Sequence, residues 1–209
     1  FLINYVQIIM QEKRNDVKIT VLMSFYNENE EYLRQSIESI LAQTFSNSEF
    51  LIINDASTDQ KSKQVADEYS QKDARIKIVE NETNLGLTRS LNKGLQIARG
   101  QYIARIDADD LAERNRLTKQ LSFLTLNPDY VLCGSWATII DENGTIIGRK
   151  KGCVEYEDIK KRIIETNFFT HSSLFFKKSV VLSLGEYDES LKKSQDYDLL
   201  LRLVPKYKI

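Results

Sequence analysis

The sequence contains few of the residues that mark several protein classes. Its 209 residues include two cysteines, two prolines, one tryptophan and one histidine. Cys133 and Cys153 have neither the density of a secreted disulfide-rich domain nor the spacing of a zinc site, so we interpret them as reduced, inert cytoplasmic thiols. No apolar run approaches the roughly 18 residues of a membrane span. The 29 basic and 30 acidic residues nearly cancel, which excludes an overall positive field for nucleic acid.

Length and composition favour a single domain. The soft prior is roughly 100–200 residues per domain, and the chain contains no linker, repeat or low-complexity segment. We expect one domain over residues 17–209, preceded by a partly helical leader over residues 1–16. The leader begins with apolar residues but has no cleavage-site pattern, so we do not interpret it as a signal peptide. Because the chain starts with Phe1, we expect it to be a fragment of a longer protein.

Strands and helices alternate through the first half of the sequence. Apolar runs predict strands and one-sided apolar spacing predicts helices. The expected strands cover residues 17–25, 49–55, 75–81 and 101–107, and the helices between them cover 30–43, 59–71 and 87–99. Continuous apolar strands separated by helices are typical of parallel pairing in an α/β fold. We therefore expect a mostly parallel central sheet flanked by helices.

The second half predicts a smaller, antiparallel part. A strand over residues 129–141 and another over 145–150 are joined by a turn. A charged helix, a short strand and a last helix should follow, over residues 155–165, 172–176 and 196–204.

Polar residues follow each of the four parallel strands. These are Ser24, Tyr26, Asn27 and Glu28, then Asn54, Asp55 and Asp59, then "NETNLG" and finally "DADD". Each group alone is explained by helix capping and turns, and for "NDASTD" we favour that explanation. Because parallel strands end at the same edge of a sheet, the four groups together predict a shared polar cleft.

The "DADD" segment predicts a binding site for a divalent metal ion. Asp107, Asp109 and Asp110 are oxygen ligands without nearby thiols, which suits Mg²⁺ or Mn²⁺. One or two of these carboxylates suffice when a substrate diphosphate supplies further oxygens. The alternative is that Asp110 caps the next helix, towards "NRLTKQLSFL".

Five segments, in order and at suitable spacing, resemble the family-2 glycosyltransferases of the GT-A fold. They are "VLMSFYNENEEYLRQSIESILAQTF", "EFLIINDASTD", "NLGLTRSLNKGLQIARGQYIARIDADD", "HSSLFFKKSVV" and "GEYDESLKKSQDYDLLLRL". The resemblance implies a Rossmann-like nucleotide-binding half over residues 17–110 and an acceptor half over 111–209. It implies an inverting, metal-dependent transfer from a UDP-sugar to a saccharide or lipid-linked saccharide, in cell-surface polysaccharide synthesis. Such an enzyme would lie in the cytoplasm, at most peripheral to the inner membrane face.

Roles carry over from this family position by position. Ser24, Phe25 and Tyr26 would line the nucleobase pocket, with Tyr26 stacked on the base. Asp55 would accept a hydrogen bond from a uracil ring nitrogen, and Asp107 would bind the ribose or surround the metal. Asp109 would bind the metal that bridges the diphosphate. The remaining nucleotide-binding positions are Glu28, Arg89 and Ala108.

Two further positions complete the implied site. His171 falls where the family often has a histidine near the donor phosphates and the metal; a structural histidine is an equal alternative. Asp196 matches the catalytic base, although Gln195 stands where the family often has Glu. A positioned carboxylate that takes the acceptor proton contributes typically about 10²–10⁴-fold, and one base opposite the leaving group implies inversion. The alternatives are that Asp196 caps the last helix and that Asp198 is the relevant acid.

Other features remain open. Trp136, Phe168 and Phe169 could line an acceptor pocket, but core packing is the simpler interpretation. The basic run "GRKKG" could approach an anionic membrane, although a solvated hairpin is simpler. The competing functions are a non-catalytic sugar-nucleotide-binding module and an aspartyl-nucleophile phosphohydrolase. The phosphohydrolases place D-x-D after the first strand, not the fourth. No G-x-G-x-x-G follows the first strand, which excludes a dinucleotide oxidoreductase.

Overall fold

A six-stranded sheet in the order β3-β2-β1-β4-β8-β5 organises the chain, in a computed structural model that describes residues 17–209. The leader expected over residues 1–16 lies outside the described residues. Strands β1 to β4 are Ile19–Phe25, Ser48–Asn54, Ile76–Glu80 and Tyr102–Arg105. The helices between them are α2 (Glu30–Leu41), α3 (Gln60–Lys72) and α4 (Leu87–Ile97). These seven elements confirm the predicted alternation.

The four strands are parallel and their carboxyl ends meet at one edge. Phe25 pairs with Asn54, and Asn54 pairs with Glu80, so three strands end at the same level. β4 lies on the other side of β1, where Arg105 pairs with Leu22. Right-handed crossovers through helices make this edge the usual ligand side of an open α/β sheet.

Of the two remaining strands of the sheet, β8 runs the other way and β5 runs in the direction of β4. β8 (Phe175–Lys177) pairs antiparallel with β4, and β5 (Leu132–Cys133) pairs antiparallel with β8. The short 3₁₀ helix η1 (His171–Ser173) precedes β8, so the antiparallel pairing brings it to the end of β4. The remaining helices are α5 (Arg116–Leu126), α6 (Tyr156–Arg162), α7 (Lys178–Ser183) and α8 (Gln195–Leu203), of which α7 was not predicted.

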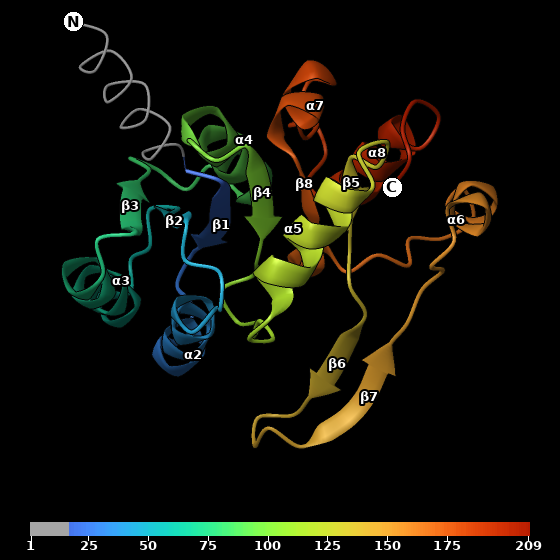
Figure 1. The fold of residues 1–209 in the computed structure, drawn as a ribbon. Coiled ribbons are helices and arrows are strands. Elements are labelled where there is room, and N and C mark those ends of the chain that lie inside the picture. The colour runs from blue at the N-terminus through green and yellow to red at the C-terminus, as the bar shows by residue number, and fades with distance from the viewer. Residues whose placement is uncertain (1–16) are drawn as a thin grey trace, which may run out of the picture.

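Each face of the sheet has its own apolar core, because side chains alternate along each strand. Ile19, Val21 and Met23 of β1 face one cluster, which includes residues of α2, α3 and α5. Leu22 faces the other cluster, with residues of α4, α7 and α8. Figure 1 shows the helices arranged on both sides of the sheet. Both faces are therefore covered, and the carboxyl edge is left for polar groups.

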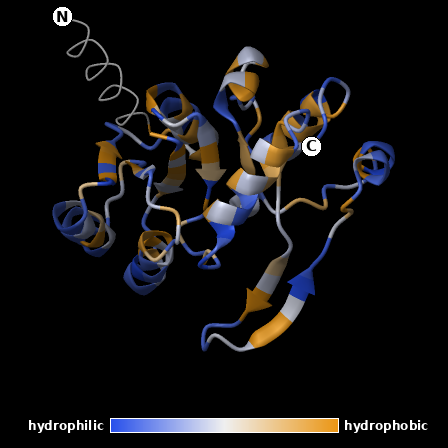
Figure 2. Ribbon diagram, in the orientation of Figure 1, coloured by the Kyte–Doolittle hydropathy of each residue, from blue (hydrophilic) through white to orange (hydrophobic). Residues whose placement is uncertain are grey.

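The prediction of a single strand over residues 129–141 is wrong, because this segment is divided between two sheets. Its first part is β5, and its second part is β6 (Ala137–Ile140), which pairs antiparallel with β7 (Ile146–Lys150). At Gly134, between them, a Cβ atom would lie 2.8 Å from the Phe169 ring, so the chain passes too close to that ring for any side chain. The β6–β7 hairpin extends away from the main sheet, and both strands carry hydrophobic residues (Figures 1 and 2).

Candidate active site

The loops at the carboxyl edge are tied to one another. Asn27, after β1, accepts hydrogen bonds from the backbone N–H groups of Thr58 (2.8 Å) and Asp59 (2.9 Å), after β2. Asp59 in turn caps α3 by accepting from the Ser62 N–H, and Asn29 caps α2. The turn explanation of "NDASTD" is therefore confirmed for Asp59. These bonds also hold the first two loops together, which supports a shared edge.

Asp55 is buried among backbone and amide donors. Its Oδ1 accepts from Asn81 Nδ2 (2.7 Å) and Leu85 N (2.8 Å), and its Oδ2 accepts from Gly86 N (2.8 Å). Gly86 has a φ of +84° and occupies the capping position before α4, so Asp55 fixes the loop that leads into that helix. A carboxylate has about four acceptor sites. Three of them are used by these donors, and the family resemblance implies that a uracil nitrogen would bond to the fourth.

The three expected nucleobase residues do not share one face. Ser24 and Phe25 are successive residues of β1, so they point to opposite faces. The Phe25 side chain is buried in the core with α2, which leaves its backbone for any contact with a ligand. Tyr26, beyond the strand, is 47% exposed. Of the three, Tyr26 has the open aromatic surface that stacking requires.

Carboxylates from two loops converge near the end of β4. The pKa of Asp109 is raised by burial and by the negative charges of Asp110 and Asp107. The pKa of Glu28, from the loop after β1, is also raised by burial and by Asp109 and Asp107. Such mutual destabilisation is relieved by a divalent cation, and carboxylate oxygens are the ligands that Mg²⁺ and Mn²⁺ prefer. The donor set therefore fits the expected metal. Ala108, between the aspartates, is buried in the core.

Within residues 17–209, no three histidine, cysteine or acidic side chains are arranged to hold a metal ion by themselves. The alternative that Asp110 caps the next helix is wrong, because α5 begins at Arg116 with Asn115 in the capping position. The intervening residues form turns: the Arg116 N–H bonds to Glu113 O (2.8 Å) and the Asp110 N–H to Asp107 O (3.4 Å). Asp110 is consequently exposed beside the other carboxylates.

His171 lies beside the end of β4. Its Nε2 is 3.1 Å from the Tyr187 hydroxyl. Burial, and then the charge of Arg105, lower the pKa of His171 well below its ordinary value, so the ring is neutral. The neighbouring Ser172 accepts a hydrogen bond from the Asp107 N–H (2.9 Å). A neutral imidazole can ligate a metal, and a bonded one can be structural, so the geometry is compatible with both interpretations.

Asp196 lies in the first turn of α8. Its Oδ2 accepts a hydrogen bond from Asn167 Nδ2 (2.9 Å). The capping alternative is wrong, because Ser194 occupies the capping position and α8 begins at Gln195. Asp198 is bonded to Arg202 (2.8 Å), which commits it to the helix surface. Burial, and the charges of Asp196 and Asp107, raise the pKa of Tyr187, so both expected site residues lie near that side chain.

The structure shows the surroundings of two arginines, which the sequence motifs do not predict. Arg89, on α4, is half-exposed and forms an ion pair with Glu189 (3.4 Å). Arg105, the last residue of β4, is 1% exposed and lies 2.5 Å from Asp107. Arg105 was missed, although a charged residue inside an apolar strand is a visible signal.

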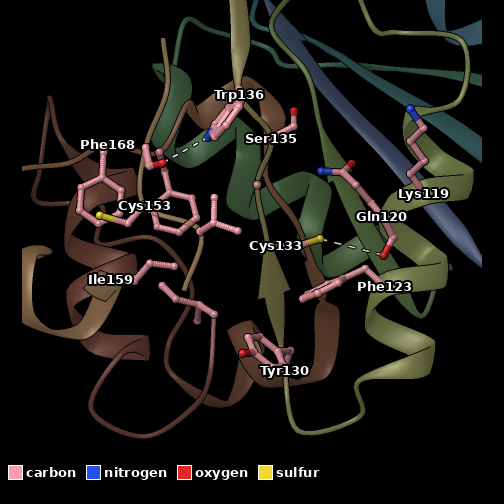
Figure 3. A pocket seen from close by; sticks show the side chains of 15 residues that line it. Lys119, Gln120, Phe123, Tyr130, Cys133, Ser135, Trp136, Cys153, Ile159 and Phe168 are labelled. Atoms are coloured by element: carbon pink, nitrogen blue, oxygen red, sulfur yellow. Dashed lines mark hydrogen bonds between the residues drawn. The ribbon is translucent and has the colours of Figure 1, made fainter. Parts of the chain in front are cut away.

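An apolar cavity of the described chain is lined by none of these carboxylates. Its volume is about 380 Å³, and it lies between α5, α6 and the residues that lead into the hairpin (Figure 3). Trp136, Phe168, Phe169, Cys133 and Cys153 are among its lining residues. Core packing is wrong for Trp136, which is 54% exposed and donates its indole N–H to Gly152 O. Both thiols are unpaired, and burial raises the pKa of Cys133 to about 12, so it is inert at neutral pH.

Comparison with known proteins gives the family. The model of the family described as "Glycosyl transferase family 2" matches residues 20–184. This chain belongs to glycosyltransferase family 2. It is 42% identical to the uncharacterised glycosyltransferase MJ1057 of Methanocaldococcus jannaschii over 89% of this chain and 64% of that protein. It is 34% identical to the amylovoran biosynthesis glycosyltransferase AmsE of Erwinia amylovora over 88% of this chain and 69% of that protein. The chain thus spans about two thirds of these relatives.

Solved structures share the fold. The mannosyltransferase PcManGT from Pyrobaculum calidifontis, in complex with GDP-Man and Mn²⁺, superposes with a TM-score of 0.66 at 17% identity. That match covers 87% of this chain and 50% of PcManGT. S. aureus TarS in complex with UDP-GlcNAc gives 0.65 at 20% identity, over 88% of this chain and 52% of TarS. The predicted GT-A-type α/β fold, with its mostly parallel sheet and small antiparallel sheet, is confirmed.

Proposed function

We propose that this chain is the donor-binding and catalytic part of an inverting glycosyltransferase, which transfers a sugar from a UDP-sugar to a saccharide or lipid-linked saccharide. The observation that carries the proposal is the gathering of Glu28, Asp107 and Asp109 in the loops after the neighbouring strands β1 and β4, together with Asp196 near Tyr187. Family membership and the polysaccharide role in the name of AmsE support it.

In the proposed donor half, Asp55 is already fixed in place by its three hydrogen bonds. Tyr26 would stack on the base, and the free acceptor site of Asp55 would bind a uracil nitrogen. Asp109, with Asp107 near the ribose and His171 near the phosphates, would hold Mn²⁺ or Mg²⁺. The structures of TarS with UDP-GlcNAc and of PcManGT with GDP-Man and Mn²⁺ support a nucleotide-sugar donor and a divalent ion. When bound, the ion would act as a Lewis acid that stabilises the leaving diphosphate.

Asp196 would take the proton of the acceptor hydroxyl. Its carboxylate is held by Asn167, which leaves the other oxygen for the acceptor. Asn167 directly precedes Phe168 and Phe169 of the apolar cavity, so an acceptor bound along Trp136 would lie near this base. Attack from the side of Asp196, opposite the leaving diphosphate, would invert the anomeric carbon.

The hairpin supports a peripheral contact with an anionic membrane surface. Ile139, Ile140, Ile146 and Ile147 are 43–65% exposed on β6 and β7, and Arg149 to Lys151 follow at the end of β7. Exposed aliphatic residues beside cations are suited to the headgroup region of an anionic bilayer. Among residues 17–209 no helix is long and apolar enough to cross a membrane. The proposed working place is the inner membrane face, where a lipid-linked acceptor would be presented.

Calorimetry with UDP, with and without Mn²⁺, tests the donor site. We expect Mn²⁺-dependent binding that weakens about 10- to 100-fold in Asp109→Ala, because that carboxylate would be a metal ligand. Glu113→Ala, a nearby exposed acid outside the convergent carboxylates, is the control and should bind as wild type does. If wild type binds GDP and not UDP, the nucleotide is wrong; if it binds neither with Mn²⁺, the function is wrong.

A further inference from the structure

Arg105 is a charged residue in the interior of the protein. It belongs to β4, whose four residues are all buried, and its side chain is 1% exposed. Its Nη2 lies 2.5 Å from Asp107 Oδ1, and Asp107 is 37% exposed at the sheet edge. Within the described residues, none of the three guanidinium nitrogens makes a hydrogen bond of acceptable geometry. The contact with Asp107 is therefore a close charge pair without oriented hydrogen bonds.

Stability does not explain this arrangement. Burying a cation is costly, and guanidinium donors left without acceptors add to that cost. Replacing a buried ion pair with apolar residues of similar volume is often neutral or stabilising. Arg116, the neighbouring buried arginine, provides a contrast: its Nη2 donates to Arg105 O (2.6 Å) and its Nε to Gln120 Oε1 (3.0 Å). Arg116 is thus a satisfied structural residue, and Arg105 is not.

The surroundings of Arg105 are the candidate site. Its charge acts on His171, on Tyr187 and on Asp109, which come from η1, the loop before α8 and the loop after β4. Asp110 and Asp107 oppose the ionised form of Asp109, and Arg105 favours it. Arg105 is therefore a fixed cation underneath the aspartates of "DADD".

We propose that Arg105 is a positioning residue of the donor site, which holds the Asp107 carboxylate in the orientation that a metal-bound nucleotide diphosphate requires. This inference rests on the proposed function. Its physical content is that the guanidinium, locked by burial, limits the rotation of Asp107 and prevents that carboxylate from collapsing onto a metal ion before the nucleotide arrives. Burial of the Arg105 cation then lowers the stability of the fold but keeps the Asp107 carboxylate ordered.

The inference predicts an unusual combination of effects for Arg105→Met, which keeps the apolar stem and removes the charge. The melting temperature should equal or exceed that of wild type. The Kd for UDP in the presence of Mn²⁺ should rise about 10- to 100-fold, as for other residues that orient ligating groups. The Kd for Mn²⁺ alone should be unchanged or lower, because a repelling cation has been removed. A residue with a merely structural role would not separate these three quantities.

Two further variants complete the experiment. Arg116→Met is the matched control, and it should lower the melting temperature because it removes satisfied hydrogen bonds. Asp107→Asn should weaken UDP binding strongly in wild type and much less in the Arg105→Met background, because the two residues act as one unit. Arg105→Lys keeps the charge but carries it on a flexible stem that holds it less firmly in place, and it should bind UDP with an affinity between those of wild type and Arg105→Met.

The outcomes distinguish this inference from the proposed function. Wild type that binds no nucleotide with Mn²⁺ would overturn the proposed function, and the role of Arg105 with it. If wild type and Arg105→Met bind UDP with the same affinity, the inference about Arg105 is overturned and the proposed function is unaffected. If Arg105→Met fails to fold, or loses stability and UDP binding together, Arg105 has only a structural role and the inference is overturned. If Arg105→Lys binds UDP with wild-type affinity, the charge alone is sufficient, and the inference is overturned as well.

Discussion

Asp55 and Asp196 are both carboxylates of the candidate site, but the protein holds them differently. Asp55 is 3% exposed and accepts hydrogen bonds from Asn81, Leu85 and Gly86. Asp196 is partly exposed and is held by the amide of Asn167. The same contrast separates the parallel half, with its interlocked loops, from the second half, with its open cavity and exposed hairpin. Under the proposed function, the first region would bind one nucleotide and can be rigid, whereas the second would have to admit and release a larger acceptor.

The largest effect is expected for a substitution of Asp196. Asp196→Asn should reduce sugar transfer by about 10²–10⁴-fold, because an amide cannot take the acceptor proton. UDP binding with Mn²⁺ should stay within a few-fold of wild type, as measured by calorimetry beside a transfer assay. Asp198→Asn, two residues further along α8 and paired with Arg202, is the control and should keep transfer. Equal losses in both variants would remove Asp196 as the base, and unchanged transfer in Asp196→Asn would favour the non-catalytic binding module.

A pair of glycine substitutions compares the packing of the two regions. A Cβ atom at Gly100 would lie 2.3 Å from the Thr20 backbone nitrogen, in the parallel half. One at Gly148, in the hairpin, would lie 3.5 Å from Ile139 Cδ1, an ordinary contact. Gly100→Ala should lower the free energy of unfolding by about 1–3 kcal/mol or more, since backbone must move. Gly148→Ala should change it little in urea titrations. Similar values for the two variants would mean that the halves are equally tolerant.

Glu49, in the parallel half, should make the stability of that half depend on pH. Burial raises the pKa of Glu49, but hydrogen bonds from Thr20 Oγ1, Arg99 N and Arg99 Nε outweigh it, so the pKa is lowered overall. A lowered folded-state pKa contributes stability above the ordinary value near 4.5, and that stability is lost as the pH falls through the folded-state value.

Glu49→Gln should therefore cost about 1–3 kcal/mol of unfolding free energy at pH 7. The difference from wild type should shrink below about pH 4. Chemical denaturation at several pH values measures both. Glu82→Gln, an exposed acid after β3, is the control and should leave stability unchanged at every pH. A difference that stays constant down to pH 3 would contradict the ionic role of Glu49.

The smallest effect is expected at the hairpin surface. Arg149→Gln with Ile147→Ser should weaken binding to vesicles containing phosphatidylserine several-fold, because each surface cation contributes about 1 kcal/mol. Lys61→Gln, on α3 of the other half, is the matched control and should bind normally. Sedimentation with vesicles of phosphatidylcholine alone gives the baseline. No vesicle binding by wild type, or a hairpin variant that changes oligomeric state instead, would contradict the membrane contact.

Local patterns predicted the parallel half well and the second half poorly. Runs such as "ITVLMSF" and "EFLIIN" are long, continuous and separated by amphipathic helices, so their pairing follows from general rules. Residues 129–141 gave one apolar run that in fact serves two sheets, because the ring of Phe169 and the hydroxyl of Ser173 intervene at Gly134 and Ser135. The alternative of a helix cap at Asp110 or Asp196 is wrong, because Asn115 and Ser194 occupy the capping positions of α5 and α8.

The sequence by itself determined the order of strands and helices and the placing of Asp55, Asp107 and Asp109 after strands, because periodicity and turn chemistry are local properties. Only the tertiary structure decided what faces these aspartates. The antiparallel strand β8 brings Ser172 to the Asp107 N–H across 65 residues of chain. Packing of α8 and of Tyr187 brings Asp196 towards Asp107, and burial of β4 places Arg105 beneath them. Such contacts depend on how distant elements share one core, which no window of neighbouring residues records.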